Sequence, residues 1–349
     1  MQAVTSQKTA ILNSLIDKAD VVSIVTHVHP DGDALGSGLA FKLYLEQVRR
    51  KKVFFWYEDN YSHGLDFLFT PSEAEYLDSL RKEDRKYRKA LQNADLLICV
   101  DCSGLARTGD IQKLFQGTKM PKVLIDHHLS PDTEAFDLCF SETEISSACE
   151  LCFQVLKAMP GIDGDASKLP LRCLTALLTG ITTDTNNFAN SVWPTTFGMA
   201  SALLATGVDR DALLQRLYQT YPEDRIRLQG LLLKDLLHIT PKGVAYMVLD
   251  RQTQRHFFLQ EGDTEGFVNL PLAIRKVRMS LFLREENGVF RVSIRSKKGT
   301  SANTLAARYF CGGGHELAAG GKFIPTRDRD KAAEAEAFIE RITEEFLSE

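Results

Sequence analysis

The sequence predicts an α/β protein with a mostly parallel sheet in a larger N-terminal domain, joined by helices to a smaller C-terminal α/β domain. Two observations support this fold class. Short apolar runs rich in β-branched residues alternate with helical segments, which is the pattern of βαβ units. The chain has 349 residues, a length that suits about two domains of ordinary size.

Four apolar runs in the first half of the chain are the predicted strands of the parallel sheet. The first, residues 21–26, is followed by a loop containing Pro and Gly and then by a helical pattern. Similar runs lie around Phe54, at residues 95–101 and at residues 122–128. Because ligands bind at the carboxyl ends of parallel strands, the polar residues that end these runs are where we expect an active site.

A long helical pattern separates the two predicted domains. It runs from Pro194 to about Leu237 and ends close to a Thr-Pro pair. We therefore expect a catalytic domain over residues 1–193, a helical connector over residues 194–239 and a second domain over residues 240–349.

The expected second domain contains three strand-like runs, VAYMVLD, MSLFLRE and VFRVSIRS, and ends in an amphipathic helix over residues 328–347. Residues 270–325 hold ten basic and three acidic side chains, a net charge of +7, so the rest of the chain carries −11. The total of −4 argues against a protein that coats long nucleic acid. A basic second domain instead suits a small anionic ligand.

The N-terminus and the cysteines indicate a cytoplasmic protein. The first residues lack the basic flank and apolar core of a secretory signal, and no run approaches the roughly 20 apolar residues of a membrane span. Seven cysteines without an export signal predict reduced thiols. The pairs Cys99/Cys102 and Cys149/Cys152 could build a structural zinc site, but buried thiols are the favoured interpretation because both pairs lie in apolar segments.

Four segments bring potential metal ligands toward the expected edge of the sheet. Their carboxylate and imidazole side chains belong to His27, His29, Asp31, Asp33, Asp101, Asp126, His127, His128 and Asp184. Each of these residues alone could be an ordinary polar loop residue, and Asp184 could be a helix cap. Four segments that each supply such ligands are hard to assign to capping.

Mixed His and Asp ligands suit Mn²⁺ or related divalent cations better than metals that prefer thiolates. A pair of such ions lowers the pKa of a bridging water and stabilises the attacking and leaving oxygens of a phosphoryl group. The sequence contains neither a G-x-S-x-G nucleophile motif nor a phosphate-binding P-loop. These observations predict phosphoester hydrolysis by a metal-bridging hydroxide, without a nucleophile from the protein.

The motifs HVHPDGDALGS, VDCSG, DHH and TGITTDT resemble the four motifs of the DHH phosphoesterase superfamily. The segment RSKKGTSANTLAARYFCGGGHELAAGG resembles the substrate-binding DHHA1 domain of that superfamily. The two resemblances together span about residues 20–325. The length and the GGGH segment are similar to those of the bacterial nano-RNase (oligoribonuclease) and pAp phosphatase branch.

The resemblance implies two Mn²⁺ ions, for which Mg²⁺ or Co²⁺ could substitute. It makes His27, Asp31 and Asp101 the ligands of one ion. The ligands of the other ion would be Asp33, Asp101, His127 and Asp184, so that Asp101 bridges the pair. The resemblance also implies that His128 contacts the phosphate or protonates the leaving oxygen, that Asp126 orients a histidine, and that His29 lies nearby without binding metal.

Substrate-binding residues are expected in the second domain, with the active site in the cleft between the domains. The resemblance places Arg295 and Ser296 at the substrate, and a guanidinium can hold a phosphate with two parallel hydrogen bonds. A glycine run is more often a flexible turn, but its exposed N–H groups also suit a phosphate. The residues of this run are Gly312, Gly313, Gly314 and His315.

The function implied is removal of 5′-mononucleotides from short oligoribonucleotides, together with conversion of pAp to AMP. One alternative is a pyrophosphate or polyphosphate phosphohydrolase, because the first domain also resembles that of manganese pyrophosphatases. Another is a phosphodiesterase for linear dinucleotides such as pGpG or pApA. A catalytically silent nucleotide-binding regulator would be expected to lack one of the six ligands. Neither long DNA nor a membrane is an expected partner, and the chain could form a homodimer.

Overall fold

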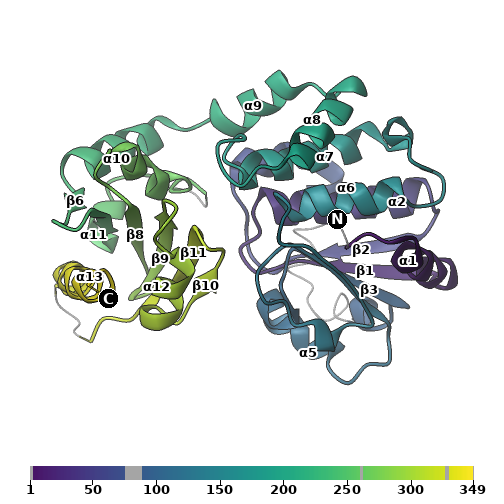
Figure 1. Ribbon diagram of the computed structural model, residues 1–349, viewed down its shortest axis with the longest axis horizontal. Helices are drawn as coiled ribbons and strands as arrows, with labels where there is room; N and C mark the ends of the chain where they lie inside the picture. Colours follow the sequence, from purple (N-terminus) through teal and green to yellow (C-terminus); the bar gives the residue numbers. More distant parts are fainter. Residues whose placement is uncertain (1–2, 75–88, 260–261, 327–329, 349) are drawn as a thin grey trace. The chain divides into compact units, whose positions relative to one another are not determined.

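The structure, a computed structural model, describes residues 3–74, 89–259, 262–326 and 330–348 (Figure 1). The chain divides into two compact units, the first ending at Thr220 and the second beginning at Tyr221. Each unit has its own sheet and its own buried core. The predicted α/β fold class, with a larger first part and a smaller second part, is confirmed.

The first unit contains a five-stranded sheet in the order β2-β1-β3-β4-β5, with every neighbouring pair parallel. The strands are β1 (Val21–Val25), β2 (Lys52–Trp56), β3 (Leu96–Val100), β4 (Lys122–Asp126) and β5 (Leu138–Ser141). The first four agree with the predicted runs. β5 was not predicted, because its four residues give too short a pattern.

Helices cover both faces of this sheet, with α2, α6 and α7 on one face and α5 on the other (Figure 1). The helices are α1 (Ser6–Lys18), α2 (Gly32–Gln47), α5 (Gln112–Phe115), α6 (Ala148–Lys157), α7 (Leu171–Asp184), α8 (Pro194–Ala205) and α9 (Arg210–Tyr218). Alternate residues of β3 point to opposite faces of the sheet. Ile98 belongs to the core that contains α2, and Leu97 belongs to the core that contains α5. Short 3-10 helices are η1 (His63–Leu68), η2 (Leu105–Ile111), η3 (Thr133–Ala135) and η4 (Ala166–Lys168).

The second unit contains a six-stranded mixed sheet in the order β10-β11-β9-β8-β7-β6, in which only the β7–β8 pair is parallel among the described strands. The strands are β6 (His238–Ile239), β7 (Val244–Leu249), β8 (Met279–Glu286), β9 (Val289–Ser296), β10 (Gly313–Gly314) and β11 (Ala318–Phe323). β7, β8 and β9 confirm the three predicted runs. Asn287 and Gly288, both with positive φ, form the tight turn between β8 and β9.

The helices of the second unit pack on opposite faces of its sheet. They are α10 (Glu223–Lys234), α11 (Arg251–Gln254), α12 (Ala302–Tyr309) and α13 (Lys331–Phe346), with the 3-10 helix η5 (Phe267–Ala273). α12 and α13 share a core with Tyr246 of β7, whereas α10 shares a core with Met247. α13 confirms the predicted C-terminal helix, except that the start of the prediction, residues 328–329, lies outside the described residues.

The segment predicted as a helical connector is helical but interrupted. α8 and α9 belong to the first unit, and α10 packs in the core of the second. Packing divides the chain after Thr220, and the predicted domain boundaries after residues 193 and 239 stay a prediction. Within the described part of the chain, none of the helices combines the length and the apolar character needed to cross a membrane.

The expectation of reduced thiols is wrong for one cysteine pair. Cys99, at the end of β3, and Cys102 form a disulfide with Cα atoms 6.5 Å apart. The left-handed backbone of Asp101, with φ 53°, turns the chain between them and returns Cys102 toward the strand. Cys149 and Cys152 are free and buried on α6, and burial raises the pKa of both thiols. They therefore behave as buried thiols, as the favoured interpretation expected.

An ion pair in the first unit predicts a pH-dependent contribution to stability. Partial burial raises the pKa of Glu73, but hydrogen bonds from Arg172 and Thr70 outweigh it and lower the pKa to about 2. The ionised carboxylate therefore stabilises the fold above pH ~4.5, and this contribution is lost as the pH falls toward 2. We expect Glu73→Gln to lower the free energy of unfolding by about 1 kcal/mol at pH 7, because both partners are partly exposed. Urea unfolding between pH 7 and pH 3 tests this, and a difference that grows on acidification would contradict it.

Candidate metal centre

The carboxyl ends of β1, β3 and β4 lie at one edge of the parallel sheet, and the polar residues predicted from the sequence follow these strands. His27 and Asp31 lie in the loop after β1, and Asp33 lies in the first turn of α2. Asp101 follows β3, and His127 and His128 follow β4. The structure brings the side chains of these three segments together with that of Asp184, the last residue of α7.

His27 and Asp31 approach Asp101 from the loop after β1. The Nδ1–H of His27 donates to the carbonyl oxygen of Val28 at 2.8 Å, and Nε2 of the same ring lies 3.4 Å from Oδ2 of Asp101. Asp31 caps α2, because its Oδ1 accepts from the amides of Asp33 and Ala34. The second carboxylate oxygen of Asp31 takes no part in these two capping bonds. His27, Asp31 and Asp101 form one group whose ligand atoms all lie within 4.8 Å of one another.

Asp33 is held from the opposite side by the first turn of α6. Its Oδ2 accepts from the amide of Ala148 at 2.7 Å, and its Oδ1 accepts from the amide of Cys149 at 2.8 Å. The carboxylate thus occupies the positive end of a helix dipole. Burial and the charge of Asp101 nevertheless raise the pKa of Asp33 to about 7. Two buried carboxylates next to each other need a cation between them to be ionised together.

Asp101 is the carboxylate shared by the groups of potential ligands. Burial alone would raise its pKa, but the imidazoles of His127 and His27 lower the pKa well below its ordinary value. Its Oδ1 is buried and accepts no hydrogen bond from a described residue. The nearest imidazole nitrogens to this oxygen, Nε2 of His127 and Nδ1 of His128, lie 3.5 Å away. Asp101 therefore offers a buried oxygen for an additional partner.

His127 lies among three carboxylates. Its Nε2 is 3.6 Å from Asp33 Oδ2, 3.5 Å from Asp101 Oδ1 and 3.6 Å from Asp184 Oδ2. Burial alone would lower the pKa of His127, but these charges raise it to about 10. The pKa of Asp184 is raised by burial and by the negative charges around it. The raised pKa of His127 means that the surrounding carboxylates stabilise a positive charge at the position of its ring.

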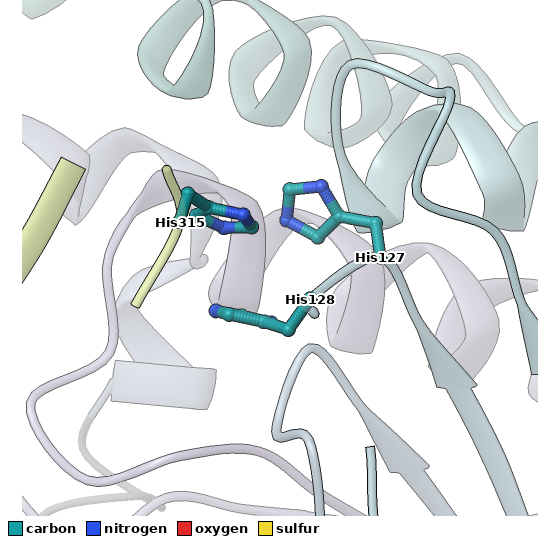
Figure 2. Close-up of side chains that lie close together, drawn as sticks. All are labelled: His127, His128 and His315. Atoms are coloured by element: carbon teal, nitrogen blue, oxygen red, sulfur yellow. The ribbon is translucent and has the colours of Figure 1, made fainter. Parts of the chain in front are cut away.

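His128 points to the same side of the chain as His127, from the next position in the loop after β4 (Figure 2). The two ring centroids lie 5.0 Å apart. Asp126, fully buried at the end of β4, accepts from the Nδ1–H of His128 at 3.0 Å and from the amide of the same residue at 3.2 Å. Asp126 therefore fixes the orientation of His128.

Arg107 of η2 was not predicted as a site residue. Its Nη1 donates to Nε2 of His128 at 3.0 Å and to Oγ of Ser103 at 3.3 Å. Since a guanidinium can only donate, Nε2 of His128 is the acceptor of this hydrogen bond. A single arginine in a short 3-10 segment has no distinctive spacing, so the sequence carries no signal for this contact.

His29 is placed apart from the groups of potential ligands. Its amide donates to Asp59 Oδ2 at 3.0 Å, and its Nδ1 lies 3.4 Å from the same oxygen. The backbone of His29 is left-handed, with φ 53°, and its side chain is 44% exposed. The loop therefore turns His29 away from the group formed by His27, Asp31 and Asp101.

The residues gathered at this edge fit divalent cations that prefer oxygen and nitrogen ligands. Three groups that lie wholly within the first unit each have ligand atoms within 4.8 Å of one another: His27, Asp31 and Asp101; Asp33, Asp101 and His127; Asp101, Asp126 and His128. All three groups contain Asp101, whose Oδ1 accepts no hydrogen bond from a described residue. No cysteine belongs to a group of this kind within the described ranges, so these residues give no support for a zinc–thiolate site.

The predicted substrate-binding residues lie in the second unit. Arg295 and Ser296 end β9, and the Oγ of Ser296 is buried without a hydrogen-bond partner among the described residues. His315, also labelled in Figure 2, lies in the turn between β10 and β11, where its amide donates to the carbonyl oxygen of Ala318 at 2.7 Å. Register pairs Arg295 with Ala318 of β11, so β9 and the turn belong to the same end of this sheet.

Packing explains two of the three glycines before His315. A Cβ on Gly312 would overlap the backbone of β11, including the Cα of Gly321 at 2.6 Å. A Cβ on Gly314 would lie 2.6 Å from the carbonyl oxygen of Ala318. Gly313 has room for a methyl group, with Asn303 Oδ1 as its nearest neighbour at 3.5 Å. The close pairing of β10 with β11 therefore requires glycine at Gly312 and Gly314, whether or not a ligand is bound.

These contacts predict different outcomes for two adjacent substitutions. We expect Gly312→Ala to destabilise the second unit by about 1–3 kcal/mol, because the added methyl group forces the hairpin strands apart. Gly313→Ala should leave the free energy of unfolding within about 0.5 kcal/mol of the unsubstituted protein. Urea titration of both variants measures the difference. Equal stability of the two variants would contradict the packing explanation.

Two family models match the chain in succession. The model described as the DHH family, N-terminal domain, matches residues 21–181, and the model of the DHHA1 domain matches residues 242–346. These matches cover the segments that carry the resemblance predicted from the sequence, except that the first match ends within TGITTDT, before Asp184.

Curated relatives and a solved structure agree with these matches. A probable bifunctional oligoribonuclease and PAP phosphatase NrnA of Streptococcus mutans is 30% identical over 86% of this chain and 89% of its own length. A bifunctional oligoribonuclease and PAP phosphatase NrnA of Thermus thermophilus is 30% identical over 93% of this chain and 90% of its own length. The crystal structure of an exopolyphosphatase-related protein from Bacteroides fragilis has a TM-score of 0.86 and 31% identity, covering 98% of each chain.

Proposed function

The chain belongs to the DHH phosphoesterase family, and from this premise we propose that it hydrolyses short oligoribonucleotides to 5′-mononucleotides and dephosphorylates pAp to AMP. The observation that carries the proposal is the buried cluster around Asp101, at the edge of a sheet where α/β enzymes bind their ligands. The relatives named oligoribonuclease and PAP phosphatase supply the substrate class.

The proposal includes two metal ions, with Mn²⁺ the first candidate. The residues that would hold them are His27, Asp31, Asp33, Asp101, His127 and Asp184, with Asp101 shared between the two ions. When bound, such cations lower the pKa of the attacking water and neutralise charge on the phosphoryl oxygens. The mixed oxygen and nitrogen donors support this choice of metal, because no thiolate takes part.

The protein's own contribution is to hold these side chains in place before substrate arrives. The carbonyl oxygen of Val28 fixes the ring of His27, and the amides of α6 fix the carboxylate of Asp33. Asp126 fixes the ring of His128. With its proton on Nδ1, His128 can accept a hydrogen bond at Nε2, and donation to a leaving oxygen requires a second proton on the ring.

We assign substrate binding to the second unit, through Arg295, Ser296, His315 and the glycine segment Gly312, Gly313 and Gly314. The buried Oγ of Ser296, which accepts no hydrogen bond from a described residue, supports this assignment. The net positive charge of residues 270–325 supports it as well, because the proposed substrates are anionic.

Arg295→Ala is expected to raise KM for pAp by roughly tenfold while kcat changes little. Loss of a charge-assisted hydrogen bond to a phosphate that is not being transferred weakens the ground state and the transition state equally. Steady-state kinetics on pAp measure both constants. A large fall in kcat at unchanged KM would instead place Arg295 at the reacting phosphate.

The experiment that tests the proposed function compares four substrates side by side with the Mn²⁺-loaded protein. These are pAp, a 5′-phosphorylated RNA dinucleotide, a 24-mer RNA and pyrophosphate, with a chelator-treated sample as control. Turnover of pAp and the dinucleotide, with little on the other two, is the expected result. Preferential hydrolysis of pyrophosphate would overturn the substrate assignment and leave the metal centre intact. A strong preference for the dinucleotide over pAp would instead favour a dinucleotide phosphodiesterase.

A further inference from the structure

Arg107 brings a positive charge to the candidate metal centre, and none of the roles assigned above uses it. It lies in η2, the 3-10 helix that follows the Asp101 turn. Its amide donates to the carbonyl oxygen of Gly104 at 3.1 Å, and its own carbonyl oxygen accepts from the amide of Val28 at 2.8 Å. The backbone of Arg107 is therefore tied to the loop that presents His27.

Among the three guanidinium nitrogens of Arg107, Nη1 makes the hydrogen bonds to described residues. Nη1 contacts Nε2 of His128 at 3.0 Å and Oγ of Ser103 at 3.3 Å. Nε and Nη2 donate to no described residue, and the residue is exposed. A fixed guanidinium that keeps free N–H groups is suited to binding a phosphate or carboxylate oxygen.

Charge at the centre favours a phosphate as that ligand. The predicted metal ligands include four carboxylates, whose charge two divalent cations would balance. A phosphate that arrives there adds negative charge, and phosphoryl transfer enzymes commonly stabilise such charge with arginine.

We infer that Arg107 binds a non-bridging oxygen of the phosphoryl group attacked at the metal centre. This inference rests on the proposed function and deepens it, since it names the residue that contacts the reacting phosphate. The contact to His128 orients the guanidinium before substrate binds, which reduces the entropy lost on binding.

The test uses three variants of the Mn²⁺-loaded protein: Arg107→Ala, Arg107→Lys and Lys113→Ala. Lys113 is a matched control, because it is a basic residue in α5, directly after η2, and its ion pair is with Asp110 at 2.8 Å. The measurements are kcat and KM for pAp, the inhibition constant of inorganic phosphate, and Mn²⁺ affinity by electron paramagnetic resonance.

For Arg107→Ala we expect kcat/KM to fall about 100-fold and the phosphate inhibition constant to rise about tenfold, with Mn²⁺ affinity within about twofold. Arg107→Lys should recover part of the activity, since it keeps the charge but loses the planar fork. Lys113→Ala should match the unsubstituted protein. Circular dichroism checks folding, and Arg107→Lys keeps the inference testable if the alanine variant unfolds.

Two results would overturn the inference. One is kcat/KM and phosphate inhibition within about threefold of the unsubstituted protein in Arg107→Ala. The other is a loss of Mn²⁺ affinity that parallels the loss of activity, which would make Arg107 a positioning residue for the metal ligands. If the unsubstituted protein hydrolyses neither pAp nor a dinucleotide, the proposed function fails. Calorimetric binding of inorganic phosphate to the Mn²⁺-loaded protein and to Arg107→Ala then still decides the role of Arg107.

Discussion

Asp101→Asn is expected to lower kcat by about 10³-fold or more and to abolish the rise in Tm that Mn²⁺ produces in the unsubstituted protein. Asp101 belongs to all three groups of potential metal ligands that lie wholly within the first unit, and its buried Oδ1 accepts no hydrogen bond from a described residue. Loss of a residue that merely supports a ligand already costs about 10–100-fold in metal affinity or activity. Loss of a carboxylate shared by two ions should cost more.

The asparagine variant keeps the shape of the side chain, so circular dichroism should show an unchanged fold. Asp95→Asn is the matched control. The Asp95 carboxylate accepts from the amides of Asp20 and Val21, at the amino end of β1 and therefore at the opposite edge of the sheet. This variant should keep its activity within about twofold. More than a tenth of normal turnover in Asp101→Asn, at saturating Mn²⁺, would contradict the role of Asp101 as the shared ligand.

The parallel sheet and the position of the metal centre could be predicted because both depend on local sequence. The alternation of short β-branched runs with helical segments identifies β1, β3 and β4. The polar residues Asp101 and His127 directly follow two of these strands, and parallel strands place such residues at a common edge. The predicted connector is divided between the two units, because α8 and α9 belong to the first and α10 to the second. The prediction that this segment is helical is nevertheless correct.

The contacts that orient these residues could not be predicted, because they join segments distant in the sequence. The amides of Ala148 and Cys149 hold Asp33 across more than a hundred residues of chain. The contact between Arg107 and His128 depends on how η2 lies against the loop after β4. Neither leaves a periodic pattern or a motif. The Cys99–Cys102 disulfide likewise depends on the backbone turn at Asp101. The lack of an export signal had predicted reduced thiols instead.

The sequence contains glycines inside helices, but the reason for glycine at these positions is visible only in the packing. Gly180 lies in the middle of α7, where glycine costs about 1 kcal/mol relative to alanine. A Cβ at this position would overlap the side chain of Cys149 on α6, whose Cβ would be 2.8 Å away, and would lie 2.7 Å from Oδ1 of Asp33. The absence of a side chain thus allows α7 to pack against α6 and against a predicted metal ligand at the same time.

Gly180→Ala is therefore expected to reduce both stability and metal binding. We expect a loss of about 3 kcal/mol in the free energy of unfolding, because the overlapping atoms belong to packed helices that cannot shift independently. Displacement of the Asp33 carboxylate from the amides of α6 should also weaken Mn²⁺ binding by about tenfold or more. Urea unfolding and electron paramagnetic resonance measure the two effects separately.

Gly198→Ala distinguishes this steric effect from the ordinary consequence of adding a methyl group to a helix. Gly198 lies within α8, is exposed, and has no atom within 4 Å of the position its Cβ would take. Alanine there should raise the free energy of unfolding by about 0.5–1 kcal/mol through reduced backbone entropy, with Mn²⁺ affinity unchanged. If Gly180→Ala were also stabilising, or kept full Mn²⁺ affinity, close packing of α7 against Asp33 would not be what requires glycine at this position.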